Sequence, residues 1–192
     1  AISKLAFELL LIAYQKNFGT KIIIARFSNF YGRGQLFHRL IPKILRCIKM
    51  NKKFPLHGNG LTKRDFIFDE DFNEAFFKIL KKGKIGEIYN IGCDEGMEYS
   101  VMDIAKILIK LIKNTENYDE WIEYVKDRPF NDQRYYISNQ KLKDLNWDIK
   151  IGLIDGLKGY LFIYFLIIKY KRLFILSKRE FESSELEILN FF

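Results

Sequence analysis

The sequence predicts an α/β fold in which helices alternate with short apolar strands. Residues 5–13 place leucine, isoleucine and alanine at roughly helical spacing, and residues 21–27 then form an apolar, β-branched run. A helix, a short loop and such a strand make half of a crossover unit, the unit from which parallel sheets are built. Of the 192 residues, 48% are hydrophobic and 16% aromatic, which is ample material for a buried core.

The same signals divide the first ninety residues into elements. Pro42 lies near the first turn of the second helix, where its missing N–H costs little. Ligands of open α/β sheets bind beyond the carboxyl ends of strands, so the loop after the first strand is a candidate site, although an ordinary polar turn explains it as well. The expected order is a helix that starts at the first residues and includes 5–13, then strand 21–27, loop 28–34, helix 36–50, strand 54–57, strand 65–68, helix 71–82 and strand 87–92.

Beyond Gly96 the pattern is mainly helical. Ser100 and Asp103 have the spacing of a capping box, which predicts a helix through Ile112. A polar loop with two arginines follows later, and a mixed-charge surface loop explains it as well as a site does. The expected order is helix 101–112, polar connection 114–120, polar loop 127–135, helix 139–145 and a helix from 151 to about 160.

The stretch Pro55–Asp71 carries the clearest signal for a ligand. Two glycines bracket Asn59 and allow a tight turn with positive φ. Arg64 follows this turn and leads into an aromatic strand, after which acidic residues open a helix, where they suit its dipole. An arginine in that position has a fixed direction, and its guanidinium suits phosphate or carboxylate. A surface turn with a solvated arginine also fits these residues.

Charge and cysteine content limit the classes of function. The net charge of +8 suits anionic partners, but short clusters such as Lys81–Lys82 are typical of solvated faces, so we expect no nucleic acid. Cys47 and Cys93 are too far apart for a disulfide framework, which favours a reducing, cytoplasmic location. His38 and His57 form no metal-ligand spacing with the cysteines, so no metal is expected.

Four motifs of the sequence stand in a characteristic order and spacing. They are Ser3-Lys4 with the helix after it, Arg26-Phe27-Ser28-Asn29-Phe30-Tyr31-Gly32, Gly58-Asn59-Gly60 with Arg64-Asp65, and Tyr89-Asn90-Ile91-Gly92 with Asp127-Arg128-Pro129. Each motif alone is weak, and together they are specific. On these motifs the chain resembles, over residues 1–160, the C-terminal part of the nucleotide-sugar dehydratases in the extended short-chain dehydrogenase/reductase family, the NAD-dependent epimerase/dehydratase family.

The resemblance implies part of an NAD(P)-binding Rossmann-like fold with a smaller, mixed α/β substrate-binding domain. Residues 1–35 and 65–92 would be the last elements of the Rossmann-like domain, and 36–64 and 93–160 the substrate-binding part. Residues 161–192 are atypical: the apolar run is shorter than the about 20 residues of a bilayer span, so no firm membrane association is expected. A peripheral membrane contact, a packing helix and non-native translated sequence are the alternatives there.

The resemblance also implies a site for NAD. Lys4 corresponds to the lysine of the family's Tyr-x-x-x-Lys motif, which binds the nicotinamide ribose and lowers the pKa of the catalytic tyrosine. Lys4 is therefore a catalytic and a cofactor-binding candidate. Ser28 and Asn29 are further cofactor-binding candidates, and Asn29 also resembles the asparagine that contacts the sugar. Phe30 stands where bacterial members have a second asparagine.

The substrate implied is a nucleotide sugar with a dTDP-hexose as the first choice. Arg64 resembles the arginine that binds the diphosphate, in agreement with its place after the glycine turn. Residues 55–57 match a segment that passes along the base. The complete set of substrate-binding candidates is Asn29, Arg39, Leu40, Pro55, Leu56, His57, Arg64, Asp127, Arg128 and Asn131.

The implied reaction is the NAD-dependent dehydration of dTDP-glucose to its 4-keto-6-deoxy product, by oxidation at C4, loss of water across C5 and C6, and return of hydride to C6. The family's tyrosine, Asp–Glu pair and glycine-rich NAD loop would lie upstream of Ala1, so we expect a fragment that is inactive alone. A full-length form would be a homodimer. The alternatives are a UDP-sugar epimerase or decarboxylase of the same family, and a non-catalytic remnant that binds nucleotide sugars.

Overall fold

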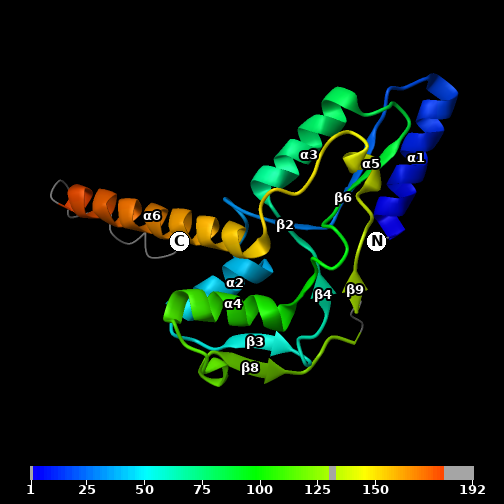
Figure 1. Cartoon of the computed structure of the whole chain (residues 1–192). Helices are drawn as coiled ribbons and strands as arrows, with labels where there is room; N and C mark the ends of the chain where they lie inside the picture. The colour runs from blue at the N-terminus through cyan, green and yellow to red at the C-terminus, as the bar shows by residue number, and fades with distance from the viewer. Residues whose placement is uncertain (1, 130–132, 180–192) are drawn as a thin grey trace.

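The computed structural model describes residues 2–129 and 133–179 and confirms the α/β prediction (Figure 1). Besides the six α-helices named next, the described residues contain one short 3-10 turn, Tyr118–Glu120. The helices are α1 (Ile2–Phe18), α2 (Leu40–Lys49), α3 (Asp69–Lys82), α4 (Val101–Lys113), α5 (Gln140–Lys143) and α6 (Leu153–Arg179). The strands are β1 (Ile24–Phe27), β2 (Asn29–Tyr31), β3 (Phe54–His57), β4 (Lys63–Arg64), β5 (Phe66–Phe68), β6 (Ile88–Ile91), β7 (Tyr99–Ser100), β8 (Ile122–Val125) and β9 (Arg134–Tyr135).

Two units of helix and parallel strand lie at opposite ends of the body (Figure 1). One holds the pair β1–β6 with α1, α3 and α5, and the other holds the pair β3–β8 with α2 and α4. Shorter strands lie between them: β2 pairs in parallel with β5, and β4 pairs with antiparallel β7 and parallel β9. The unit with α2 and α4 has a core around Ile44 and Leu108, called the first core from here on. The unit with β1 and β6 has a core around Ile91 and Trp147, called the second core.

Local sequence signals explain the helices of the first core. The apolar stripe of α2 is buried against α4, as its periodicity predicts. Pro42 is the third residue of α2, where no intrahelical N–H bond is lost. The Ser100 hydroxyl accepts a bond from the Asp103 N–H at 3.0 Å, and the Asp103 carboxylate accepts one from the Ser100 N–H at 3.0 Å. The predicted capping box of α4 is therefore confirmed.

Several predicted boundaries were wrong, and three of them concern the site or the last helix. Residues 28–34 are not all loop, because Asn29–Tyr31 pair with Phe66–Phe68 as β2. The helix expected over 36–50 begins only at Leu40, because the preceding residues form a turn. The helix expected to stop near 160 continues to Arg179, because residues 160–179 contain no glycine or proline to end it. Within the described part of the chain, no helix combines the length and apolar character needed to cross a membrane.

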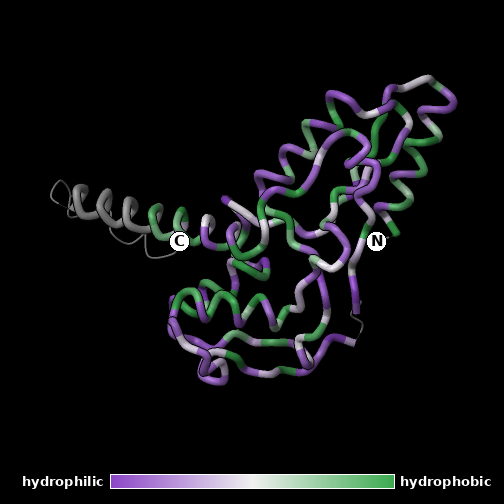
Figure 2. Tube along the Cα trace, in the orientation of Figure 1, coloured by the Kyte–Doolittle hydropathy of each residue, from purple (hydrophilic) through white to green (hydrophobic). Residues whose placement is uncertain are grey.

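The helix α1 is exposed along most of its length. None of its described residues is buried, and Leu5, Phe7 and Leu9 are each more than half exposed. Hydrophobic residues follow this helix along most of its length (Figure 2). Its Glu8 carboxylate pairs with Arg26 of β1 at 2.5 Å, which fixes the helix beside the strand. An apolar face of this extent is typical of an interface rather than of free surface.

Candidate functional site

The glycine turn at residues 58–60 has the predicted geometry. Gly58 and Gly60 have φ of +59° and +68°, and the Asn59 side chain accepts a hydrogen bond from the backbone N–H two residues later at 3.0 Å. The turn leads into β4, which places Arg64 on the middle strand of a three-stranded sheet. Its Nη1 donates to the carbonyl of Lys63 at 2.7 Å. Arg64 thus lies on a paired strand and not in an isolated surface turn.

A first cleft of about 230 Å³ lies beside β3 and β4. Its lining is basic, because Lys43 joins Arg64 and Arg128 there, and none of the described residues that line it carries a carboxylate. A concave surface of one charge sign concentrates ligands of the opposite sign, so this cleft suits an anion. The predicted substrate-binding residues that line it are Asn29, Leu40, Pro55, His57, Arg64 and Arg128.

A second cleft of about 460 Å³ adjoins the first, since Asn29, Leu40 and Phe66 line both. It lies where β1 ends and β2 begins, and Lys4 of α1 forms part of its wall. This is the carboxyl end of a parallel strand, where open α/β sheets bind their ligands. The predicted residues that line it are Lys4, Ser28, Asn29, Arg39 and Leu40.

Phe30 has a packing role in the second cleft. Its ring stacks on that of Phe72, with centroids 4.4 Å apart and 18° between the planes, and it also contacts the ring of Phe27. The same cleft is lined by three residues with a buried oxygen that has no hydrogen bond: Oγ of Ser28, Oε1 of Gln35 and Oδ1 of Asp69. This wall therefore combines an aromatic surface with polar acceptors.

Two predicted residues among those that the structure describes do not line the clefts. Leu56 is fully buried in the first core, so only its backbone is available to a ligand. Asp127 accepts a hydrogen bond from the Arg128 N–H at 2.8 Å. A Cβ added to Gly58 would be only 2.7 Å from Oδ2 of Asp127, so the carboxylate packs directly against this glycine. Asp127 thus supports the glycine turn beside the first cleft. Asn131 lies outside the described residues.

Lys43 is a cleft residue that sequence reasoning missed. Its charge on a helix suggested a solvated side chain, yet it is half-buried and its Nζ lies 5.7 Å from the centroid of the Phe54 ring. The available signal was its spacing of three residues from Leu40, which puts both on one side of α2. Correct use of that signal needs the orientation of α2 relative to β3, which the sequence does not contain.

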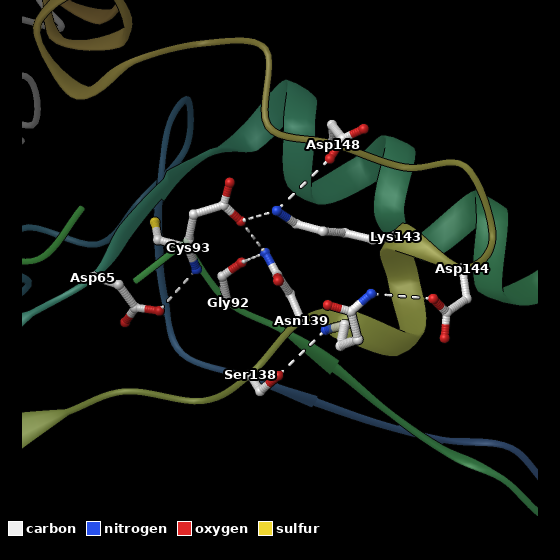
Figure 3. Close-up of polar contacts among 10 residues, drawn as sticks. Asp65, Gly92, Cys93, Ser138, Asn139, Lys143, Asp144 and Asp148 are labelled. Carbon is white, nitrogen blue, oxygen red and sulfur yellow. Dashed lines mark hydrogen bonds and ion pairs between the residues drawn. The ribbon is translucent and has the colours of Figure 1, made fainter. Parts of the chain in front are cut away.

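The residue after Arg64 is a fully buried aspartate (Figure 3). Oδ2 of Asp65 accepts a hydrogen bond from the Cys93 N–H at 3.1 Å, which joins the start of β5 to the end of β6. Burial raises the pKa of Asp65, and burial, together with the Asp65 charge, raises the pKa of the Cys93 thiol to about 12. Cys93 is therefore a protonated, structural thiol near neutral pH.

Asn139 extends this network toward α5 (Figure 3). Its Nδ2 donates to the Gly92 carbonyl at 3.1 Å and to Oδ1 of Asp94 at 2.7 Å, and Lys143 of α5 lies 2.9 Å from the same carboxylate. The Asn139 hydrogen bond, with help from Lys143, holds the pKa of Asp94 below its ordinary value. These hydrogen bonds fix the backbone of residues 92–94, directly after the end of β6.

These features define an open α/β protein with two adjoining clefts, one of them basic, beyond its strand ends. Residues 1–92 match the family model described as the NAD dependent epimerase/dehydratase family. The chain belongs to this family, which confirms the resemblance found in its motifs, and the family is NAD-dependent.

Curated relatives of the chain include several dTDP-glucose 4,6-dehydratases. The chain is 42% identical to dTDP-D-glucose 4,6-dehydratase of Homo sapiens over 161 aligned residues. This alignment covers 82% of this chain and 45% of the human protein. Identity with dTDP-glucose 4,6-dehydratase of Haemophilus influenzae is 36% over 171 residues, covering 83% and 51%. The chain spans about half the length of these relatives.

Solved structures agree with this fold. The dTDP-glucose 4,6-dehydratase of Bacillus anthracis in complex with NAD matches with a TM-score of 0.74 and 34% identity, over 82% of this chain and 49% of that one. UDP-glucuronic acid 4-epimerase of Bacillus cereus, in complex with UDP-glucuronic acid and NAD, matches with a TM-score of 0.74 and 26% identity, over 83% and 50%. The expected Rossmann-like, extended short-chain dehydrogenase/reductase fold is thus confirmed.

Proposed function

We propose that this chain forms the nucleotide-sugar-binding part of an NAD-dependent dehydratase that converts dTDP-glucose to dTDP-4-keto-6-deoxyglucose. The observation that carries the proposal is the pair of adjoining clefts, which share Asn29 and Leu40 and divide most of the predicted substrate and cofactor residues between them. The dTDP-glucose 4,6-dehydratases among the relatives support the choice of substrate.

The first cleft has the chemistry for a nucleoside diphosphate. Arg64 and Arg128 offer guanidinium groups that bind phosphate oxygens in pairs, and Lys43 adds a point charge. Pro55 and His57 lie on the less buried face of β3 and would contact the base of the nucleotide. Nδ1 of His57 is 3.2 Å from the Lys126 carbonyl oxygen. The buried Asp65 next in the chain holds the backbone of Arg64 in place.

The second cleft fits NAD by the chemistry of its donors. The ammonium of Lys4, the hydroxyl of Ser28 and the amide of Asn29 are groups that bond to ribose hydroxyls and a carboxamide. NAD, when bound, supplies the hydride acceptor for the sugar. Lys4 would hold the ribose and favour an ionised phenol beside it, and Asn29, which lines both clefts, would orient the sugar.

A UDP-sugar substrate is the second candidate. The chain is 40% identical over 157 residues to an Arabidopsis thaliana enzyme whose activities include UDP-glucose 4,6-dehydratase, close to its identity with the human dTDP-glucose enzyme. Thymine and uracil differ by one methyl group, which is worth about 0.8 kcal/mol when buried. Sequence identity alone therefore does not separate the two substrates.

Calorimetric titration of the chain with dTDP, and with UDP for comparison, tests the proposal. We expect dTDP to bind, and Arg64→Ala to weaken binding by about tenfold to a hundredfold, because a hydrogen bond to a charged group contributes about 1.5–3 kcal/mol. Lys110→Ala, which removes one exposed charge outside both clefts, is the control and should bind as the unmodified chain. Equal weakening by both variants, or none by Arg64→Ala, would refute the assignment.

Turnover is a separate prediction. We expect this chain alone to bind dTDP-glucose without converting it, since Lys4 is the one catalytic candidate that its motifs supply. Formation of the 4-keto product by the purified chain would refute this expectation and would leave the assignment of the binding site intact. Binding of UDP in preference to dTDP would move the chain to the UDP-sugar branch.

A further inference from the structure

A groove of about 700 Å³ lies along α2 and adjoins the two clefts, sharing His38 and Lys43 with the first and Leu36 with the second. We call it the α2 groove. Its apolar lining comes from Leu36, Phe37 and Met50, whose exposed fractions are 64%, 56% and 49%. The thiol-bearing Cys47 of α2, which is half-buried, also lines it. Exposed apolar surface gathered in a concave site is typical of a binding surface.

The α2 groove is also basic. Besides its apolar residues it is lined by His38, Lys43, Arg46 and Lys52, and no acidic residue is found among the described residues that line it. The same imbalance runs along the chain, because residues 9–64 contain twelve lysines and arginines and no aspartate or glutamate. Complementary charge decides which partners such a surface accepts, so its occupant should be both apolar and acidic.

The segment 180–192 of this chain has that composition. It contains glutamates at positions 180, 182, 185 and 187, and six of its other residues are phenylalanine, leucine or isoleucine. It contains no lysine or arginine. We propose that segment 180–192 of one copy of the chain docks in the α2 groove of a second copy.

The geometry of α6 favours a second copy over the chain's own groove. The first part of α6, from Leu153 to Tyr164, packs in the same core as α2. From Tyr164 to Arg179 α6 runs away from the body for 15 further residues, about 22 Å at 1.5 Å per residue (Figure 1). To reach its own groove, segment 180–192 would have to reverse direction after Arg179 and run back along α6. The groove of another copy carries no such constraint.

Each part of the segment has a counterpart in the groove. Its glutamates would face Arg46 and Lys52, both of which are exposed and therefore free to reorient. Its aromatic and aliphatic side chains would cover the three exposed apolar residues of the groove. The pairing is reciprocal, since each copy supplies one segment and one groove, and two copies can satisfy each other as a closed dimer.

A cross-link between two differently sized chains tests the proposal. The donor chain carries Leu186→Cys and Cys47→Ser, and the acceptor chain carries a mass-shifting tag and the native Cys47. Because Cys93 is only 2% exposed, Cys47 is the accessible thiol of the acceptor. After treatment of the mixture with a short bis-maleimide, we expect a heterodimer whose peptide map shows the 47–186 link.

Charge reversal gives the matched controls. Arg46→Glu in the acceptor should lower the yield of heterodimer at least fivefold, and Glu185→Arg with Glu187→Arg in the donor should restore it. Lys110→Glu in the acceptor changes an exposed cation of α4 outside the groove and should leave the yield unchanged. Circular dichroism of each variant establishes that it is folded.

Three results would overturn the proposal. The first is the absence of a heterodimer from folded chains. The second is a yield that does not respond to Arg46→Glu. The third is a link formed only within single chains when Leu186→Cys and the native Cys47 are present together, because that result would assign the segment to its own groove.

Discussion

Gly156 of α6 lies where the structure leaves no room for a side chain. A Cβ at this position would be 2.1 Å from the hydroxyl oxygen of Tyr31 and 3.1 Å from its Cζ. Tyr31 is 1% exposed, and its hydroxyl donates to the Leu153 carbonyl at 3.2 Å. Gly156→Ala and Tyr31→Phe therefore act on one contact between α6 and β2, and we predict that their effects on stability are not additive.

The magnitudes follow from the geometry. Overpacking a core costs about 1–3 kcal/mol, and the 2.1 Å contact with a rigid ring puts Gly156→Ala toward the upper end of that range. Alanine recovers about 1 kcal/mol through helix propensity, so the net loss should be about 2 kcal/mol. Tyr31→Phe removes one buried hydrogen bond, about 1 kcal/mol. Without the hydroxyl the nearest contact becomes 3.1 Å, so the double variant should lose about 1–2 kcal/mol less than the sum.

Urea unfolding followed by circular dichroism would measure this coupling in the four proteins of the cycle. Gly159→Ala is the matched control, because it is in the same helix and a Cβ there has no neighbour within 4 Å. It should be neutral or stabilising by up to about 1 kcal/mol. Effects of Gly156→Ala and Tyr31→Phe that add to within about 0.5 kcal/mol would refute the packing argument.

Two further predictions concern single polar residues. Ser100→Ala should lower the free energy of unfolding by about 1 kcal/mol, because the Asp103 N–H loses its acceptor, while Ser100→Gly should cost only a few tenths; equal losses in urea titrations would contradict a capping role. Asp65→Asn should raise the free energy of unfolding at pH 7 by about 1 kcal/mol, because burial raises the pKa of Asp65 and disfavours its ionised form. With a raised pKa in the folded state, protonated Asp65 contributes its full stability only below the unfolded pKa of about 3.9. The higher free energy of unfolding of Asp65→Asn relative to the unmodified chain should therefore disappear as the pH falls to 4 and below. A difference between the two proteins that stays constant from pH 4 to 8 would contradict this argument.

Elements with local signals were predictable from the sequence. The capping residues of α4, the glycines that flank Asn59 and the apolar stripe of α2 are each written in a few neighbouring residues. The strands β4, β7 and β9 were missed because each has two residues and exists only through pairing with segments distant in the chain. The length of α6 was missed for the opposite reason, since no residue after Gly159 signals a stop before Arg179.

The candidate site shows the same division. Arg64 was predictable, because a glycine turn before it and a buried strand after it leave few directions for its side chain. Lys43 was not, since its place in the first cleft depends on the orientation of α2 against β3. The structural role of Asp65 was not predictable. Its burial and its hydrogen bond to a backbone N–H 28 residues away depend on the tertiary structure.

The presence of two separate cores has a consequence for cooperativity. Leu40, which lines both clefts, packs against the first core, while Phe30 of the second cleft stacks on Phe72, which packs against the second core. A ligand there needs both cores folded and in their native arrangement. At a concentration of one hundred times its Kd, a ligand stabilises the state that it binds by about 2.7 kcal/mol. Here that state is the one in which both cores are folded and joined. Two cores that melt independently without ligand should then melt in a single transition with it, so the shape of a thermal unfolding curve reports whether the two units hold one site between them.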